Sequence, residues 1–159
     1  MDTPLTPEAS NIGWPFSITG VPLVTPTPAP NETLTPVHPS GNAVFADCAP
    51  QVDKEITFPE RFAPNFPFPP QTKFFKVATL NNNPNYVEVV GYAPLNFKDS
   101  VRYLLAELPQ AGYTLGRGDA EGAEAESFFD GNGWRGGFRV NEIFYCPDVT
   151  EWVVIVFKF

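Results

Sequence analysis

The side chains with the most potential for chemistry are carboxylates gathered in one short stretch. No Lys, Arg or His interrupts its acidic residues, which are Asp119, Glu121, Glu124, Glu126 and Asp130. Clustered carboxylates hold Ca²⁺ or Mg²⁺ in many proteins, and a carboxylate pair is enough for general acid and base catalysis. The stretch therefore allows a metal-dependent enzyme that uses the 119–130 acidic run. The preferred interpretation is a solvated strand edge whose like charges prevent edge-to-edge association.

More specific catalytic and metal-binding motifs do not fit. Asp130 and Asn132 superficially resemble a calcium loop, but Trp134 replaces a ligand and Asn141 replaces the bidentate Glu. The sole histidine, His38, lies among prolines with nothing nearby to orient it as a base. We therefore predict that the protein is not an enzyme and has no catalytic residue, bound metal or cofactor.

The two cysteines are Cys48 and Cys146, far apart and without a C-x-x-C neighbour or a nearby histidine. This spacing argues against zinc ligation. In a chain poor in lysine and rich in proline and threonine, we predict one disulfide in an oxidising compartment; the alternative is two buried free thiols. The disulfide would close a loop of about 100 residues, which stabilises a fold by ~3–5 kcal/mol in the chain-entropy treatment.

A glycine-rich strand beginning at Trp134 holds one set of candidates for partner binding. Arg135 and Arg139 share one face of this strand, and Trp134 and Phe138 share the other. Arginines beside an acidic strand usually form cross-strand ion pairs. Exposed arginines would instead suit an anionic or carbohydrate partner.

Trp14 and Phe16 are the second set of candidates. They interrupt residues 1–46, a Pro- and Thr-rich segment whose prolines favour an extended polyproline II path. We expect residues 1–46 to form an arm or linker that docks on protein, either another subunit or its own domain. The alternative is a mobile tail with incidental apolar residues.

Charge and hydropathy limit the partners and the location. The net charge of −8 and the scattering of the ten basic residues argue against a nucleic-acid partner. The longest strongly apolar run, Trp152 to Phe157, is too short for a transmembrane segment. The first residues lack the pattern of a secretory signal. We expect an extracytoplasmic protein, secreted or at the cell surface, with the signal peptide absent from this chain.

One helix and several strands must position these candidates. Asn96 to Gly112 has a complete helix pattern: Asn96 caps the start, Leu104 and Leu108 share one face, and Pro109 with Gly112 marks the end. Apolar and β-branched residues between turn signals predict the strands. Their expected ranges are 73–80, 86–92, 113–129, 134–143 and 151–159.

This order predicts an α+β fold. It consists of an antiparallel sheet of about five strands (β-β-α-β-β-β) with one helix packed on one face, preceded by a Pro-rich extended arm. We expect residues 47–159 to form the domain, with 47–70 as a Phe- and Pro-rich strap over a 71–159 core.

A helix that ends in a Leu-Pro-x-x-Gly-aromatic pattern precedes the glycine-punctuated strands. The residues are Leu108, Pro109, Gln110, Ala111, Gly112 and Tyr113, followed by Phe128, Gly131, Gly133, Gly136, Gly137 and Phe138. In this region the chain resembles uncharacterised bacterial secreted or lipoprotein-type α+β domains with an N-terminal Pro/Thr-rich linker. The resemblance implies an extracytoplasmic location and no particular activity, and the chain has no lipobox cysteine.

These observations lead us to expect a non-catalytic extracytoplasmic binding or assembly module. One alternative is a structural subunit of a surface assembly whose N-terminal arm docks on a neighbouring subunit. The other is the metal-dependent enzyme that uses the acidic run.

Overall fold

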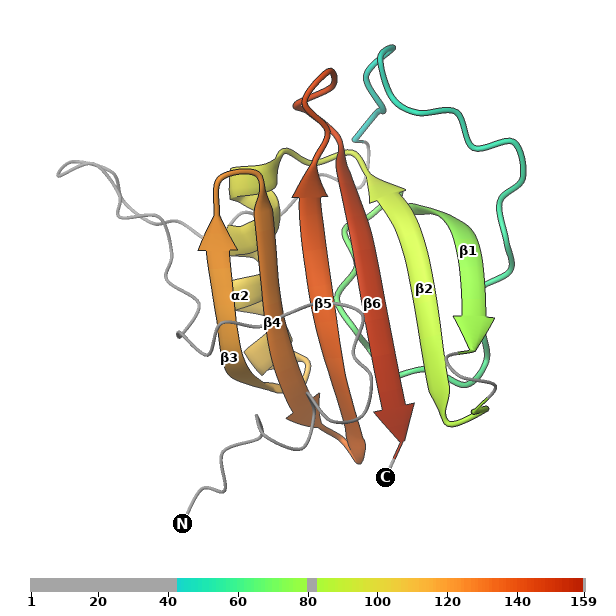
Figure 1. Cartoon of the computed structure of the whole chain (residues 1–159), viewed down its shortest axis with the longest axis vertical. Helices are drawn as coiled ribbons and strands as arrows, with labels where there is room; N and C mark the ends of the chain where they lie inside the picture. The colour runs from blue at the N-terminus through green and yellow to red at the C-terminus, as the bar shows by residue number, and fades with distance from the viewer. Residues whose placement is uncertain (1–42, 80–82, 159) are drawn as a thin grey trace, which may run out of the picture.

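The computed structural model describes residues 43–79 and 83–158 (Figure 1). The segment with Trp14 and Phe16 lies outside the described residues. The described elements are β1 Lys73–Thr79, β2 Tyr86–Ala93, α2 Phe97–Gln110, β3 Thr114–Glu121, β4 Glu124–Gly131, β5 Trp134–Glu142 and β6 Thr150–Lys158.

The strands form one antiparallel sheet of six, in the order β1-β2-β6-β5-β4-β3. The last strand, β6, lies inside the sheet because it pairs with β2 on one side and β5 on the other. The α+β prediction is confirmed in its main feature, an antiparallel sheet with one helix. The expected number of strands was wrong, since the sheet has six strands instead of about five.

The extra strand comes from the region expected to be one strand over 113–129. It forms a hairpin in which β3 and β4 pair and Glu121 lies opposite Glu124. Gly122 makes the turn with a φ of 56°, a backbone conformation that favours glycine. β3 is therefore an edge strand of the sheet, and β4 is an inner one.

The start of α2 follows the expected capping pattern. Asn96 Oδ1 accepts a hydrogen bond from the Asp99 backbone N–H at 2.8 Å, which satisfies a donor that the helix leaves unpaired. The helix ends at Gln110, within the expected span of Asn96 to Gly112, and Pro109 lies within its last turn. Gly112, at a φ of 94°, then reverses the chain, and the Tyr113 N–H donates to the Leu108 carbonyl at 3.1 Å.

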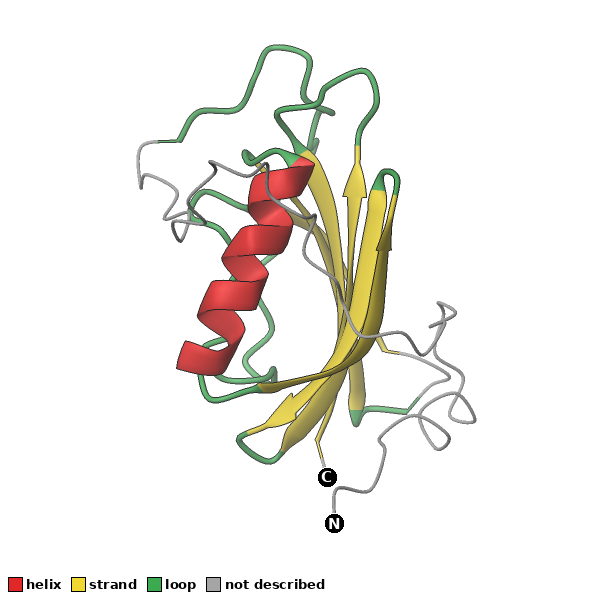
Figure 2. Ribbon diagram, turned by 90° about the vertical axis from the view of Figure 1, so that its left-hand side faces the viewer, coloured by secondary structure: helices red, strands yellow, loops and turns green. Residues whose placement is uncertain are grey.

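One face of the sheet, the α2 face, packs against the helix (Figure 2). Leu104 and Leu108 of α2 are fully buried there, and so is Trp152 at the centre of the sheet. The Trp152 indole N–H donates to Thr150 Oγ1 at 2.9 Å, and the Ser100 hydroxyl of α2 lies 3.1 Å from the same oxygen. The buried polar groups of Ser100, Thr150 and Trp152 are therefore paired, as burial requires.

Phenylalanines that precede β1 cover another part of the α2 face. Phe66 packs on Phe129 and Phe68 packs on Trp152, with ring centroids 5.1 and 6.2 Å apart. The Tyr103 hydroxyl of α2 donates to the Phe68 carbonyl at 3.2 Å. This contact ties the helix to the Phe-rich segment, so both cover the same face.

Candidate binding site

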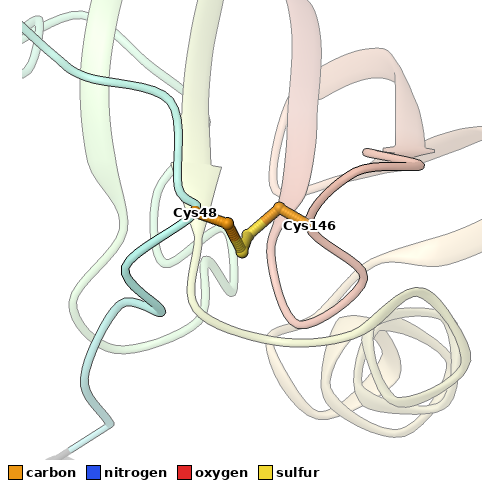
Figure 3. The surroundings of a disulfide bond; sticks show 2 residues. All are labelled: Cys48 and Cys146. Carbon is orange, nitrogen blue, oxygen red and sulfur yellow. A yellow bond between two sulfur atoms is a disulfide. The ribbon is translucent and has the colours of Figure 1, made fainter.

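The predicted disulfide between Cys48 and Cys146 is confirmed (Figure 3). The two Cα atoms lie 5.5 Å apart, although the residues are 98 positions apart in the chain. Cys146 is fully buried in the loop between β5 and β6, so the bond joins the segment before β1 to this loop. A disulfide is typical of proteins in oxidising, extracytoplasmic compartments.

The β5–β6 loop presents two aromatic side chains on a fixed base. The Cys146 N–H donates to the Ile143 carbonyl at 2.8 Å, and the Val149 N–H donates to the Cys146 carbonyl at 3.1 Å. Phe144 and Tyr145 lie between these anchors with exposed fractions of 90% and 56%. Their rings meet edge to face with centroids 5.4 Å apart. We call these two residues the aromatic tip.

A pocket of about 280 Å³ adjoins the aromatic tip. It is small compared with most small-molecule sites, which measure roughly 300–1,000 Å³. The pocket therefore suits one side chain or one small ring better than a large cofactor. Its lining residues are Pro50, Tyr92, Asn141, Glu142, Ile143, Phe144, Tyr145 and Glu151.

The lining of this pocket is aromatic and acidic. Asn141 Nδ2 donates to Glu151 Oε1 at 3.2 Å, which orients the carboxylate. Burial raises the pKa of the Tyr92 hydroxyl, and Glu151 and Tyr145 raise it further. Tyr92 thus stays protonated as a hydrogen-bond donor at neutral pH. Because no Lys or Arg is among its described lining residues, the pocket favours a positively charged group.

The acidic run is divided between two strands and engaged in part by an arginine. Arg139 Nη2 lies 3.1 Å from Glu126 Oε2, and its Nε lies 3.7 Å from Glu124 Oε1. The expected cross-strand ion pairs are therefore confirmed for Arg139. Asp119 lies on the edge strand β3. Asp130 lies at the end of β4 that is far from Glu124. Within residues 43–79 and 83–158, no group of three or more Cys, His, Asp or Glu is placed to hold a metal ion.

The other predicted partner-binding residues occupy different environments. Trp134 is only 6% exposed and belongs to the core cluster on the α2 face, so its ring is not a surface feature. Arg135 is exposed on the other side of the same strand. The predictions for Trp14 and Phe16 fall outside the described residues.

The sequence prediction did not include Phe144 and Tyr145. Their signal was two consecutive aromatics directly before Cys146 and Pro147, at the point where a strand gives way to a turn. An aromatic pair at such a position is equally typical of a buried strand end. In the structure, the disulfide and the loop hydrogen bonds hold the loop so that these rings face solvent.

The chain matches no protein-family model, and no significant match was found among curated proteins or among solved structures. In the part of the chain that the structure describes, no helix has the length and apolar character needed to cross a bilayer. The fold and the site together define a disulfide-bonded α+β domain with an exposed aromatic loop.

Proposed function

We propose that the protein is a non-catalytic binding module that works outside the cytoplasm, secreted or at the cell surface, and that the aromatic tip contacts its partner. The observation that carries this proposal is the 90% exposure of Phe144 on a loop anchored by a disulfide through the buried Cys146. Because the Phe144 ring is so exposed, it adds little to the stability of the fold. Rigidly presented aromatic side chains are, in contrast, frequent hot spots of protein interfaces.

The chemistry beside the tip favours a basic segment of another protein as the partner. Glu142 and Glu151 supply carboxylates, and Tyr92 and Tyr145 supply ring faces that attract a cation. The pocket volume of about 280 Å³ suits a single Lys or Arg side chain. The net charge of −8 would accelerate encounter with a basic partner through long-range attraction.

A structural subunit of a surface assembly, with the N-terminal arm docked on a neighbouring subunit, is the second candidate function. The apolar side chains on the sheet face opposite α2, among them Ile155 and Phe128, favour this candidate because they offer a docking surface. A metal-dependent enzyme that uses the 119–130 run has less support, since Arg139 already engages Glu124 and Glu126.

Selection from a randomised peptide library displayed on phage tests the proposed function. The bait is the full oxidised chain, and the recovered peptides are measured against wild type and the double variant F144A/Y145A. We expect enrichment of Lys- and Arg-containing peptides, and at least about tenfold weaker binding to the double variant, as for a hot spot. Val77→Ala is the matched control, because Val77 is a 40% exposed apolar residue on β1, away from the loop.

Two results would contradict the proposed function. Recovered peptides that are not enriched in Lys or Arg would contradict the proposal that the partner is a basic segment. Equal binding to wild type and to F144A/Y145A would show that the aromatic tip does not contact the partner.

A further inference from the structure

The sheet has a second apolar surface on the face opposite α2, which we call the opposite face. The register places Phe128 of β4, Gly137 of β5 and Ile155 of β6 side by side in one row across it. Val153 of β6 and Val90 of β2 are neighbours in the next row. Antiparallel strands with one face in water normally alternate apolar and polar residues, but β6 is apolar on both faces from Trp152 to Phe157.

Side chains on the opposite face are as buried as those of a covered surface. Ile155 is 0% exposed, Phe128 is 5% exposed and Val90 is 7% exposed. Gly137 has no side chain to shield Ile155 from the side, so this burial requires atoms above the sheet. No helix or loop among the described residues lies over this face in the two views of the molecule (Figures 1 and 2).

The charged groups on the opposite face are also withdrawn from water. Glu88 is 8% exposed and pairs with Lys76, and Glu126 is 6% exposed and pairs with Arg139. Burial raises the pKa of Glu126 despite the opposing effect of Arg139. Carboxylates on an open sheet face would be hydrated, so these two behave as parts of an interface.

We propose that the opposite face is the docking surface for residues 14–24 of the same chain. In this segment Trp14, Phe16 and Ile18 alternate with Pro15, Ser17 and Thr19, and Val21 and Leu23 follow. An extended chain with this period presents Trp14, Phe16 and Ile18 on one side. The segment thus has apolar side chains of the kind that would pack on the buried row of Phe128, Gly137 and Ile155. This inference goes beyond the proposed function and does not depend on it.

The prolines in residues 14–24 favour docking of this segment across the opposite face over its addition as a strand at an edge of the sheet. Pro15 and Pro22 have no N–H to donate to a strand ladder, which makes the segment a poor edge strand. Its side chains remain free to pack on a flat apolar surface. The acidic residues Asp119 and Glu121 on the edge strand β3 also disfavour pairing there.

The chain has enough length to reach this face from the point where it is fixed. The disulfide holds Cys48 at the β5–β6 loop, at one end of the central strands. Residues 25–42 between the segment and the described chain extend to at most ~65 Å at roughly 3.3–3.6 Å per residue. A sheet of six strands is about 24 Å wide at a strand spacing of ~4.8 Å. The segment therefore reaches any part of the opposite face without strain.

Methyl NMR spectroscopy of the full oxidised chain tests this proposal. Isoleucine δ1 labelling gives a simple spectrum, because the isoleucines are Ile12, Ile18, Ile56, Ile143 and Ile155. We expect nuclear Overhauser contacts from the Ile155 methyl to the rings of Trp14 or Phe16. We also expect the Ile155 signal to shift by more than its linewidth in Trp14→Ala and not in Leu5→Ala, a control in the same arm. These effects should be independent of protein concentration.

Several results would overturn the proposal. One is an Ile155 signal that has no contact with residues 14–24 and does not move in Trp14→Ala. Another is contacts that vanish on dilution, or that join differently labelled copies in a mixed sample, since these would assign the face to a second copy of the chain. If Trp14→Ala fails to fold, Phe16→Ala and Ile18→Ala test the same contact with the indole ring intact.

Discussion

On the α2 face of the sheet, the large side chains have described neighbours above them, from Leu104 and Leu108 of the helix to Phe66 and Phe68 before β1. On the opposite face, Ile155 is as buried as Leu104, but no described element supplies the cover. The two faces use the same strands, so the strands alone do not explain the difference. One face is closed by local structure, and the other needs a separate segment or partner.

The difference between the two faces suggests that one face stabilises the fold and the other binds a segment or partner. The α2 face buries large apolar side chains with few polar groups, which is the composition of a permanent core. The opposite face mixes apolar residues with ion pairs such as Arg139 with Glu126, which is closer to the composition of an interface. We therefore expect substitutions on the α2 face to affect folding and those on the opposite face to affect docking.

Loss of the disulfide should have the largest effect, because it anchors the chain that leads into the Phe-rich cover of the α2 face. The double variant C48S/C146S should lose ~3–5 kcal/mol of unfolding free energy, measured by urea denaturation. Reduction of the wild-type chain should cause the same loss. Reductant should leave the double variant unchanged, and a loss in both proteins would contradict this account of the bond.

The next largest effect should come from truncation beneath the helix. Leu104→Ala removes a fully buried side chain from the α2 face and should cost roughly 2–5 kcal/mol in urea denaturation. Leu105→Ala is the matched control, because Leu105 is the adjacent residue and is only half-buried. Equal losses in the two variants would contradict the orientation of α2 and the comparison between the faces.

The smallest effect concerns a carboxyl group on the opposite face. The pKa of Glu126 is raised above 4.5 mainly by burial, with Arg139 opposing the shift and Glu124 and Asp119 adding to it. The folded state then binds this proton more tightly than the unfolded state. The stability contributed by the group is full below the unfolded pKa and is lost as the pH rises through the folded pKa.

Glu126→Gln should flatten this part of the dependence of unfolding free energy on pH. The measurement is urea denaturation at a series of pH values that begins below the ordinary pKa of 4.5 and rises from there, the direction in which the pKa is shifted. Glu121→Gln, an exposed carboxylate on the edge strand, is the control and should keep the wild-type slope. An unchanged slope in Glu126→Gln would show that the opposite face does not exclude water.

Local signals in the sequence were sufficient for the helix and for most strands. Asn96, Leu104 and Gly112 define α2 because a cap, an apolar face and a stop act within a few residues. The hairpin at Gly122 was missed since β3 and β4 are rich in Gly, Ala and acidic residues, which have low strand propensity. β4 nevertheless forms a strand because it pairs with β3 on one side and with β5 on the other, and such pairing is not visible in local composition.

The candidate site was harder to predict than the fold. The disulfide followed from the presence of only two cysteines. The exposure of Phe144 and the burial of Trp134 did not follow, because both are aromatic residues beside a turn. Trp134 is buried because its ring packs in the core on the α2 face, and Phe144 is exposed because it lies in the loop that the disulfide at Cys146 anchors. Both are tertiary properties.

Hydroxyl-radical footprinting of the monomeric full chain tests most directly whether both faces of the sheet are covered. Phe128 and Phe129 are adjacent residues on opposite faces, with exposed fractions of 5% and 1%, and Phe144 is an exposed reference at 90%. We predict that Phe128 is protected as well as Phe129 in the wild-type chain and reacts in a W14A/F16A/I18A variant in which Phe129 stays protected. Oxidation of Phe128 at the rate of Phe144 in the wild-type monomer would contradict the account.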